Sequence, residues 1–359
     1  MLHIIYPYRN REEERVKRSL DSLSAQTNTN FKVYFVDYGS KTQRAKSVEA
    51  LVATYTFAKY QYHPTSLQPW NKSRALNHVI KQLHDGFCFV ADIDMIFHNE
   101  FVERAISLQK EDTAVYFKVG FLDEAETKKE KPYEHYKIHF LSTNEATGLT
   151  MFPVEALHEI RGFDEFYHFW GSEDTDVHIR LKNNGKTVTF YDAETLMLHQ
   201  WHPSYRSKET GVLTKNLQIT DIVPLNYQHL KHAIAKGVTS VNPEEWGEIM
   251  EETTATLLTE TFKEPLVLSN RKEEVAHVLH AVLAEKWQGV RSFKISPDDF
   301  QNTSKYRIKK LLGKKVPNYY SMRDVNDMLL LHIITYYRNY PYIYQVLEDK
   351  NTIEFALLK

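Results

Sequence analysis

Cysteine is almost absent from this chain of 359 residues, which contains only Cys88. A single thiol excludes an intramolecular disulfide framework and a zinc site built on cysteines. Proteins without disulfides are typical of a reducing cytosol, so we expect a cytoplasmic protein.

A charge excess of one sign is also lacking. The chain has 45 Lys and Arg residues against 47 Asp and Glu residues, for a formal net charge of −2. The chain as a whole therefore offers no electrostatic field for nucleic acid, and we expect no nucleic-acid partner.

Long apolar runs are missing as well. The run Met328–Ile334 falls far short of the roughly 20 residues that cross a bilayer, so we expect no transmembrane anchor. The first apolar segment, Leu2–Tyr6, lacks a basic flank and runs directly into Pro7. We expect this segment to be a buried strand rather than a signal peptide.

What the chain does contain is the composition of an ordinary globular protein, with 42% hydrophobic and 26% charged residues. Its length favours two units. Up to about residue 205, short β-type runs alternate with amphipathic helical patterns, which is typical of a parallel or mixed α/β sheet. The expected strands are Leu2–Tyr6, Lys32–Asp37, Tyr60–His63, Phe87–Ala91, Ala114–Val119 and Thr187–Tyr191. The expected helices are Glu12–Ser24, Asn71–Leu83 and Phe101–Gln109, with apolar residues three and four apart.

After Pro203 the pattern changes. Strand signals fade, and helical windows follow at Pro243–Phe262, Arg271–Trp287 and Val325–Tyr337. We therefore expect one catalytic domain over residues 1–205 and a mainly helical unit over residues 206–359, with no low-complexity linker between them.

Two carboxylates follow one of the expected strands directly, in the segment Phe89-Val-Ala-Asp92-Ile-Asp94. On an extended backbone, residues i and i+2 point the same way, so both acids would face the crevice at the carboxyl end of the sheet. Such a pair suits Mn²⁺ or Mg²⁺ carrying a diphosphate. The alternative is a helix-capping or loop aspartate.

Two histidines three residues apart follow another expected strand, in His199-Gln-Trp-His202. A lone histidine would be a packed or surface residue, but a pair at this spacing makes a mixed Asp/His metal site plausible. Mixed nitrogen and oxygen ligands favour Mn²⁺ over Ca²⁺.

An aromatic and acidic cluster lies at residues 162–176 and becomes helical at Val177–Leu181. Acids in the first turn of a helix are stabilised by its dipole, so a simple capping segment is one interpretation. The other is a sugar site, because Trp170, with Phe169 or Tyr167 beside it, offers a flat apolar face next to carboxylates that can act as a base.

Four segments resemble, in order and spacing, the β1,4-galactosyltransferases and equally the bacterial family 2 enzymes, including chondroitin-polymerase-type domains. These segments are Tyr6–Arg11, Trp70–Asn77, Phe87–Asp94 and Phe169–Asp176. The resemblance covers roughly residues 1–205. It implies a GT-A fold, which is a Rossmann-like mixed sheet flanked by helices, together with a UDP-sugar donor, Mn²⁺ (or Mg²⁺) and inversion at the anomeric carbon.

The resemblance also implies roles for individual residues. The donor would contact residues of the first three segments and of one strand end: Pro7, Tyr8, Arg9, Arg11, Asp37, Asn71, Lys72, Asp92 and Ile93. Asp37 lies in a segment similar to the Asp-Asp-Gly-Ser turn of family 2, with Tyr38 in place of one aspartate; a simple turn residue ahead of Gly39 is the alternative.

For the reaction itself, Asp94 matches the direct metal ligand of the family. His199 and His202 match the spacing of its Met-x-x-His ligands, with His in place of Met. Trp170, Glu173 and Asp174 match its Trp-Gly-Gly-Glu-Asp segment, with Ser172 in place of a glycine. Asp174 would then be the base, with Glu173 as the second candidate, while Trp170 and Glu173 would bind the acceptor.

The resemblance therefore predicts an inverting, metal-dependent glycosyltransferase that moves a hexose or N-acetylhexosamine from a UDP-sugar to a glycan hydroxyl, in bacterial surface polysaccharide or glycolipid synthesis. One alternative is a nucleotidyltransferase acting on sugar phosphates, although this predicts a glycine-rich loop after the first strand, where Pro7–Arg11 stands instead. Another is a non-catalytic sugar-binding module.

A basic segment lies in the second unit. Six Lys and Arg residues and no acid fall within residues 305–315, interleaved with Ile308, Leu311 and Leu312 at helical spacing. Such a helix can rest on anionic lipid, which would place the enzyme at the inner face of the cytoplasmic membrane, near a glycolipid acceptor. The alternative is a solvated helix packed by its apolar side.

Overall fold

The computed structural model describes residues 1–203, 212–349 and 351–359, which divide into two compact units. The first unit comprises residues 1–66, 70–203 and 223–249, and the second comprises residues 67–69, 212–222, 250–349 and 351–359. The expected boundary between residues 205 and 206 lies outside the described residues. Among these residues, no helix is long and apolar enough to cross a bilayer.

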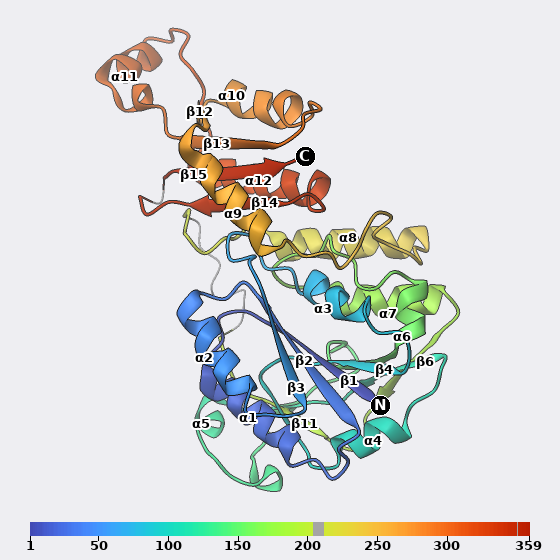
Figure 1. Ribbon diagram of the computed structural model, residues 1–359. Helices are drawn as coiled ribbons and strands as arrows, with labels where there is room; N and C mark the ends of the chain where they lie inside the picture. The colour runs from blue at the N-terminus through green and yellow to red at the C-terminus, as the bar shows by residue number, and fades with distance from the viewer. Residues whose placement is uncertain (204–211, 350) are drawn as a thin grey trace. The chain divides into compact units, whose positions relative to one another are not determined.

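A seven-stranded mixed sheet is the centre of the first unit, in the order β10-β6-β9-β4-β1-β2-β3 (Figure 1). Its strands are β1 (Leu2–Tyr8), β2 (Phe31–Tyr38), β3 (Ala58–His63), β4 (Phe87–Val90), β6 (Thr113–Phe117), β9 (Thr150–Pro153) and β10 (Thr187–Tyr191). All neighbouring pairs are parallel except those of β9, which runs antiparallel to β4 and β6.

Helices cover both faces of this sheet, because successive side chains of a strand point to opposite faces. In β1, Ile4 packs in the core with α1 (Glu13–Ser24), α2 (Thr42–Val52) and α4 (Phe101–Ser107). Its neighbour Ile5 packs in the other core with α3 (Lys72–Ile80), α6 (Val154–Glu159) and α7 (Glu173–Asn183). Burial on both faces explains why β1 is an unbroken run of buried residues rather than an alternating one.

The expected α/β alternation of the first unit is confirmed. All six expected strands and all three expected helices are present, with ends that differ by a few residues. Helix α2, strand β9 and the short strands of the next sheet were not expected. The unexpected strands span four residues or fewer, which is too few to show a clear period.

A second, four-stranded sheet of the first unit has the order β5-β11-β7-β8. Its strands are β5 (Met95–Phe97), β7 (Gly120–Phe121), β8 (Phe140–Leu141) and β11 (Met197–His199). The antiparallel pairing of β11 with β5 sets His199 opposite Met95. Segments that are about a hundred residues apart therefore meet directly after Asp94.

The second unit contains a sheet, so the expectation of a mainly helical unit was wrong in this respect. Four strands have the order β12-β13-β15-β14: β12 (Leu266–Ser269), β13 (Val290–Ser296), β14 (Tyr342–Val346) and β15 (Ile353–Leu358). The aromatic residues near the C-terminus, such as Tyr342 and Tyr344, are buried strand residues. Aromatic side chains favour strands, and this signal was overlooked.

The expected helices of the second unit are present, but most are shorter. They are α9 (Glu252–Glu260), α10 (Lys272–His277), which continues as a π-helical turn to Val282, α11 (Ser304–Leu311) and α12 (Met322–Tyr336). The window Pro243–Phe262 is helical only from Glu252, because Trp246 and Gly247 belong to the first unit and pack in its core as an irregular segment. The remaining long helix, α8 (Ile222–Lys236), lies almost wholly in the first unit.

Candidate metal and catalytic site

Asp92 and Asp94 lie at the carboxyl end of β4, as expected, but they point to different partners. Ile93 and Asp94 form a turn, so the backbone is no longer extended there. The Asp92 side chain is 43% exposed and reaches Lys72, whereas Asp94 is buried and faces the two histidines. Ile93 is buried. Of the two acids, only Asp94 belongs to the cluster with His199 and His202 that could hold a metal ion.

The structure brings Asp94, His199 and His202 together. The Nε2 atom of His202 lies 3.0 Å from Oδ2 of Asp94, and that of His199 lies 3.5 Å from Oδ1. One ligand atom from each residue lies within 4.8 Å of the others, close enough for one ion to bind all three. A further hydrogen bond, from the Gln200 backbone N–H to the Asp94 carbonyl, fixes the histidine segment against the turn.

The electrostatics of these three residues fit a cation. Burial by itself would raise the pKa of Asp94, but the two histidines outweigh it and hold the pKa well below its usual value. Burial lowers the pKa of His199, which favours the neutral ring that a metal requires. The hydrogen bond with Asp94 raises the pKa of His202.

A buried carboxylate oxygen without a hydrogen-bond donor in the described part of the chain also indicates a cation site. Asp94 Oδ1 is buried and accepts no hydrogen bond from the described residues. The Nδ1 atom of His202 is 2.9 Å from the Pro203 carbonyl oxygen, so an Nδ1–H that donates there leaves Nε2 free as a ligand. These donors fit Mn²⁺, which accepts both imidazole and carboxylate ligands.

Lys72 links this region to the expected base. Its ammonium nitrogen lies 3.3 Å from Oδ2 of Asp174, 3.5 Å from Oδ1 of Asp92 and 3.6 Å from Oε1 of Glu173. Lys72 is the first residue of α3, while the two other acids, Glu173 and Asp174, open α7. Although burial favours the neutral amine, the three carboxylates raise the pKa of Lys72 well above its usual value.

Asp174 is the acid whose proton affinity is most altered here. Burial raises its pKa to about 8, against the opposing effect of Lys72 and with further contributions from Glu173 and Asp92. A carboxyl group with a raised pKa is a better proton acceptor once it is ionised, as general base catalysis requires. The backbone of Gly148 approaches Asp174 so closely that an added Cβ would lie 3.4 Å from its Oδ2.

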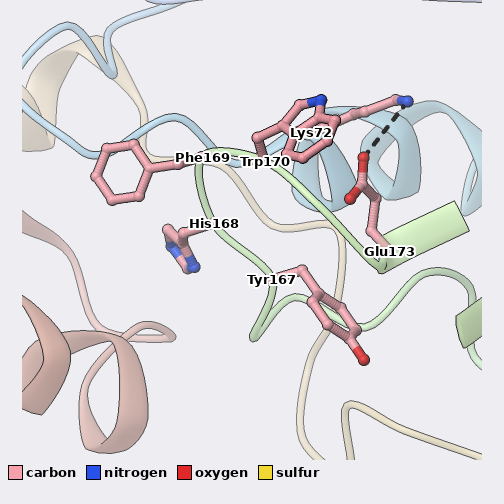
Figure 2. A pocket seen from close by; sticks show the side chains of 6 residues that line it. All are labelled: Lys72, Tyr167, His168, Phe169, Trp170 and Glu173. Atoms are coloured by element: carbon pink, nitrogen blue, oxygen red, sulfur yellow. Dashed lines mark ion pairs between the residues drawn. The ribbon is translucent and has the colours of Figure 1, made fainter. Parts of the chain in front are cut away.

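A pocket lies beside this cluster and is lined by Lys72, Glu173 and residues 167–170 (Figure 2). Trp170 is 47% exposed, and among residues 163–170 it is the exposed aromatic side chain. Tyr167 and Phe169 are buried, so the structure does not support them as alternative stacking surfaces. The Tyr167 hydroxyl instead donates to Asp176.

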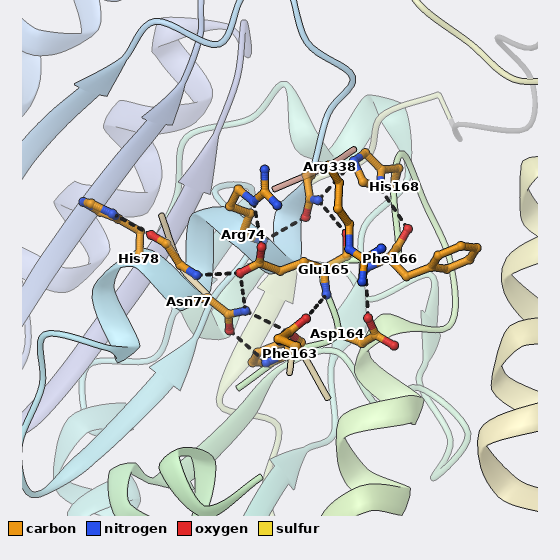
Figure 3. Close-up of polar contacts among 12 residues, drawn as sticks. Arg74, Asn77, His78, Phe163, Asp164, Glu165, Phe166, His168 and Arg338 are labelled. Carbon is orange, nitrogen blue, oxygen red and sulfur yellow. Dashed lines mark hydrogen bonds and ion pairs between the residues drawn. The ribbon is translucent and has the colours of Figure 1, made fainter. Parts of the chain in front are cut away.

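A buried polar network holds the aromatic loop on α3 (Figure 3). The carboxylate of Glu165 accepts hydrogen bonds from Arg74 Nε at 2.7 Å, Asn77 Nδ2 at 3.0 Å and the Gly247 backbone N–H at 2.6 Å. Its side chain is only 2% exposed. This network fixes the distance between α3, which carries Lys72, and the loop that leads to α7.

Two residues expected to bind the donor are buried and make hydrogen bonds within the fold. Asn71 is fully buried: its Oδ1 caps α3 by accepting from the Arg74 N–H, and its Nδ2 donates to the Glu165 carbonyl. Asp37 is also fully buried, and its carboxylate accepts from the Ser40 N–H and the Tyr60 hydroxyl. For Asp37 the turn interpretation is therefore the one that the geometry favours.

The segment after β1 supplies cations near the site. Pro7 and Tyr8 belong to the buried strand, and the Tyr8 hydroxyl donates to the Arg11 carbonyl. The Arg9 guanidinium donates to the backbone carbonyls of Tyr38 and Thr65. Arg11 is close enough to help lower the pKa of Asp94, and Arg15 donates to the backbone carbonyls of Gln200 and Trp201 beside the histidines.

Sequence reasoning missed several supporting residues. The Phe121 ring lies tilted against the His199 ring, with centroids 4.8 Å apart, and nothing in the local sequence of β7 indicates this contact. The network around Glu165 did leave a signal. Asn71, Arg74 and Asn77 follow each other at three-residue spacing, so they lie on one side of the helix, and all three are buried. Buried polar side chains need hydrogen-bond partners, so this spacing indicates a polar network.

Two family models match the chain. Residues 3–162 match glycosyl transferase family 2, and residues 130–205 match a model described as the N-terminal domain of galactosyltransferase. The two matches cover the sheet, the Asp92–Asp94 turn and the histidine segment. Together with the mixed sheet flanked by helices, they confirm the expected GT-A fold. No curated protein matches the chain.

Several solved structures are similar to this chain. The mannosyltransferase PcManGT from Pyrobaculum calidifontis, in complex with GDP-Man and Mn²⁺, shares 16% identity over 55% of this chain and 56% of that one, with a TM-score of 0.41. GalNAc-T7 with UDP, GalNAc and Mn²⁺ shares 12% identity over 65% of this chain and 48% of that one, with a TM-score of 0.48. S. aureus TarS 1–349 shares 15% identity over 97% of this chain and 94% of that one, with a TM-score of 0.46. The chain thus spans about half the length of the first two.

Proposed function

Since the N-terminal part of this chain is a glycosyltransferase domain of the GT-A type that matches glycosyl transferase family 2, we propose that it transfers a hexose or N-acetylhexosamine from a UDP-sugar to a glycan hydroxyl, with inversion at the anomeric carbon. The reaction depends on a divalent cation. Its biological setting is the synthesis of bacterial surface polysaccharide or glycolipid.

One observation carries this proposal. The ammonium group of Lys72 contacts both Asp92, in the turn that presents the metal ligand, and Asp174, the candidate base. A donor held at the turn and an acceptor held against Asp174 would therefore meet within the length of one side chain. This closeness is what a direct displacement between two bound substrates needs.

Asp94, His199 and His202 are the residues that would hold the cation. When bound, a divalent ion such as Mn²⁺ neutralises charge on the diphosphate leaving group. Arg11 adds positive charge on the protein side of the same region. Asp92, which is half exposed, is available to the donor beside this charge.

Lys72 holds the ionised Asp174 carboxylate in place. Asp174 accepts the proton of the acceptor hydroxyl as that oxygen bonds to the anomeric carbon and the bond from this carbon to the diphosphate breaks. A single base and one displacement give inversion, since the acceptor oxygen attacks the anomeric carbon directly and no enzyme nucleophile attacks it first. Glu173 lies beside Asp174 and orients an acceptor hydroxyl, and the exposed ring of Trp170 supports the apolar face of the acceptor sugar.

The test is UDP release from a panel of UDP-galactose, UDP-N-acetylgalactosamine and UDP-glucose, with and without Mn²⁺ and with a panel of glycan acceptors. We expect release that needs both acceptor and metal, and a product whose anomeric configuration by NMR is opposite to that of the donor. Asp94→Ala should abolish it, whereas Asp192→Ala, which removes an exposed carboxylate of the same unit, should not.

Other outcomes would contradict the proposal in recognisable ways. Pyrophosphate release from a nucleoside triphosphate and a sugar phosphate would identify a nucleotidyltransferase. Sugar binding without turnover under any condition would identify a non-catalytic module. Retention of the donor's anomeric configuration would leave a glycosyltransferase but refute the role of Asp174 in a single displacement.

A further inference from the structure

Helix α11 (Ser304–Leu311) and the turn that follows it form the most basic segment of the second unit. Lys305, Arg307, Lys309, Lys310, Lys314 and Lys315 lie within this segment, and no acid occurs between residues 300 and 323. We call these six residues, together with Ile308, Leu311 and Leu312, the α11 surface. Figure 1 shows α11 standing apart from the sheet of its own unit.

Tyr306 shows which side of α11 faces the protein. Its ring lies 5.7 Å from the ring of Phe300 and 5.6 Å from that of Tyr319, so this side of the helix is anchored by aromatic contacts. At about 100° per residue, Ile308, Leu311 and Leu312 fall on the opposite side of the helix from Tyr306.

The large aliphatic residues of α11 consequently point to solvent. Ile308 is 57% exposed, Leu312 63% and Leu311 87%. The sequence left open a helix packed by its apolar side, and these exposures contradict that alternative. Burying these side chains elsewhere would be favourable, because each offers apolar area that the second unit leaves in water.

Cations border this apolar stripe. In helical projection, Arg307 lies on one edge of the stripe and Lys305 on the other. Lys314 and Lys315 follow Gly313, just beyond the end of the helix. Aliphatic side chains between cations match the depth profile of an anionic bilayer surface, where phosphates lie above the acyl chains.

We propose that the α11 surface docks this protein on an anionic lipid bilayer. Ile308, Leu311 and Leu312 enter the boundary between headgroups and acyl chains, and the cations beside and after this stripe, Lys305, Arg307, Lys314 and Lys315, contact lipid phosphates. A soluble polyanion would use the cations but would leave the three aliphatic residues in water. A second copy of the same surface would cover the aliphatic residues but would oppose six cations with six others.

The test is co-sedimentation of the full chain with vesicles of phosphatidylcholine alone, and with vesicles that also contain phosphatidylglycerol, at low and high salt. We expect binding to the mixed vesicles that weakens as salt rises, and much weaker binding to the neutral ones. Leu311→Ser/Leu312→Ser and Lys305→Glu/Arg307→Glu should each reduce affinity for the anionic vesicles at least about tenfold.

Two matched controls come from the same unit. Val267→Ser removes an apolar side chain that is 67% exposed in β12, and Lys286→Glu reverses an exposed charge outside the α11 surface. Neither should change vesicle binding by more than about twofold. Because the substituted α11 residues are exposed, thermal unfolding of every variant should stay within a few degrees of the parent, which separates lost docking from lost folding.

Three results would overturn the proposal. Equal binding to neutral and anionic vesicles, unaffected by salt, would remove the role of the cations. Full binding by Leu311→Ser/Leu312→Ser, together with competition by soluble polyphosphate, would identify a site for a soluble polyanion. Self-association of the chain that this variant abolishes, without vesicle binding, would identify an interface between two copies.

Discussion

Replacement of Lys72 by Met tests the central contact of the candidate site. The substitution keeps a long unbranched side chain but removes the cation that lies 3.3 to 3.6 Å from the carboxylates of Asp174, Asp92 and Glu173. Three acids would then face one another without a counter-charge. We expect the variant to fold, to be less stable and to need a higher pH for activity.

The magnitude follows from the distances and the burial. At an effective dielectric constant of about 20, a pair of unit charges roughly 3.5 Å apart interacts with about 5 kcal/mol. Asp174 and Glu173 count most, since their side chains are 20% and 11% exposed, whereas Asp92 is 43% exposed and better screened. Removing one partner of such a buried pair costs about 3–5 kcal/mol of unfolding free energy.

The pH dependence has a definite sign. The pKa of Asp174 is raised in the folded protein, so the folded state holds this proton more tightly than the unfolded chain. Stability therefore falls as pH rises from the ordinary carboxyl pKa through the raised one. Without Lys72 the pKa of Asp174 rises further. The substitution Lys72→Met should therefore lower the free energy of unfolding more at neutral pH than near pH 4.

The assay is kcat/KM for UDP-sugar consumption as a function of pH, together with denaturant unfolding at two pH values. The acid limb of the profile should move upward by at least about one pH unit. A raised KM for the donor is also expected through the contact with Asp92, but a change in KM alone would not move the pH limb. Lys72→Arg, which keeps the charge, should restore most of the profile.

Lys81→Met is the matched control in the same region. Lys81 follows α3 and pairs with Glu245 and Glu248 at 2.8 and 2.6 Å, but all three side chains are partly or largely exposed. Its loss should cost no more than about 1 kcal/mol and should leave the pH profile unchanged. If Lys72→Met has an unshifted profile and wild-type stability, then Lys72 does not set the charge of Asp174 and the reasoning fails.

Three further predictions concern neighbouring residues. Asp94→Ala should weaken Mn²⁺ binding at least about a hundredfold by calorimetry and remove several kcal/mol of transition-state stabilisation; wild-type turnover in Mn²⁺ would exclude Asp94 as a ligand. Asp174→Asn should abolish turnover while metal and donor still bind, and Glu173→Gln should mainly raise the acceptor KM; the reverse order of severity would make Glu173 the base. Arg74→Met should lower unfolding free energy by about 3–5 kcal/mol, because it leaves the Glu165 carboxylate buried without its cation, and a loss below about 1 kcal/mol in denaturant unfolding would contradict that burial.

The sequence by itself determined the elements whose signal is local. β1 and β4 are apolar runs, α1 and α3 have apolar residues three and four apart, and each pattern follows from the geometry of a strand or helix with a buried side. It also placed Asp94 after a strand, and Glu173 and Asp174 at the start of a helix, because adjacent residues in the sequence determine where each element ends or begins.

Only the tertiary structure decided which of these residues meet. His199 reaches Asp94 because β11 pairs with β5, and Lys72 reaches Asp174 because the network around Glu165 holds two distant segments together. The sheet of the second unit escaped prediction for the same reason: β13 pairs with β12 on one side and β15 on the other, across long stretches of chain. Strand register and buried polar partners depend on side chains far away in the sequence, and periodicity along the chain does not record them.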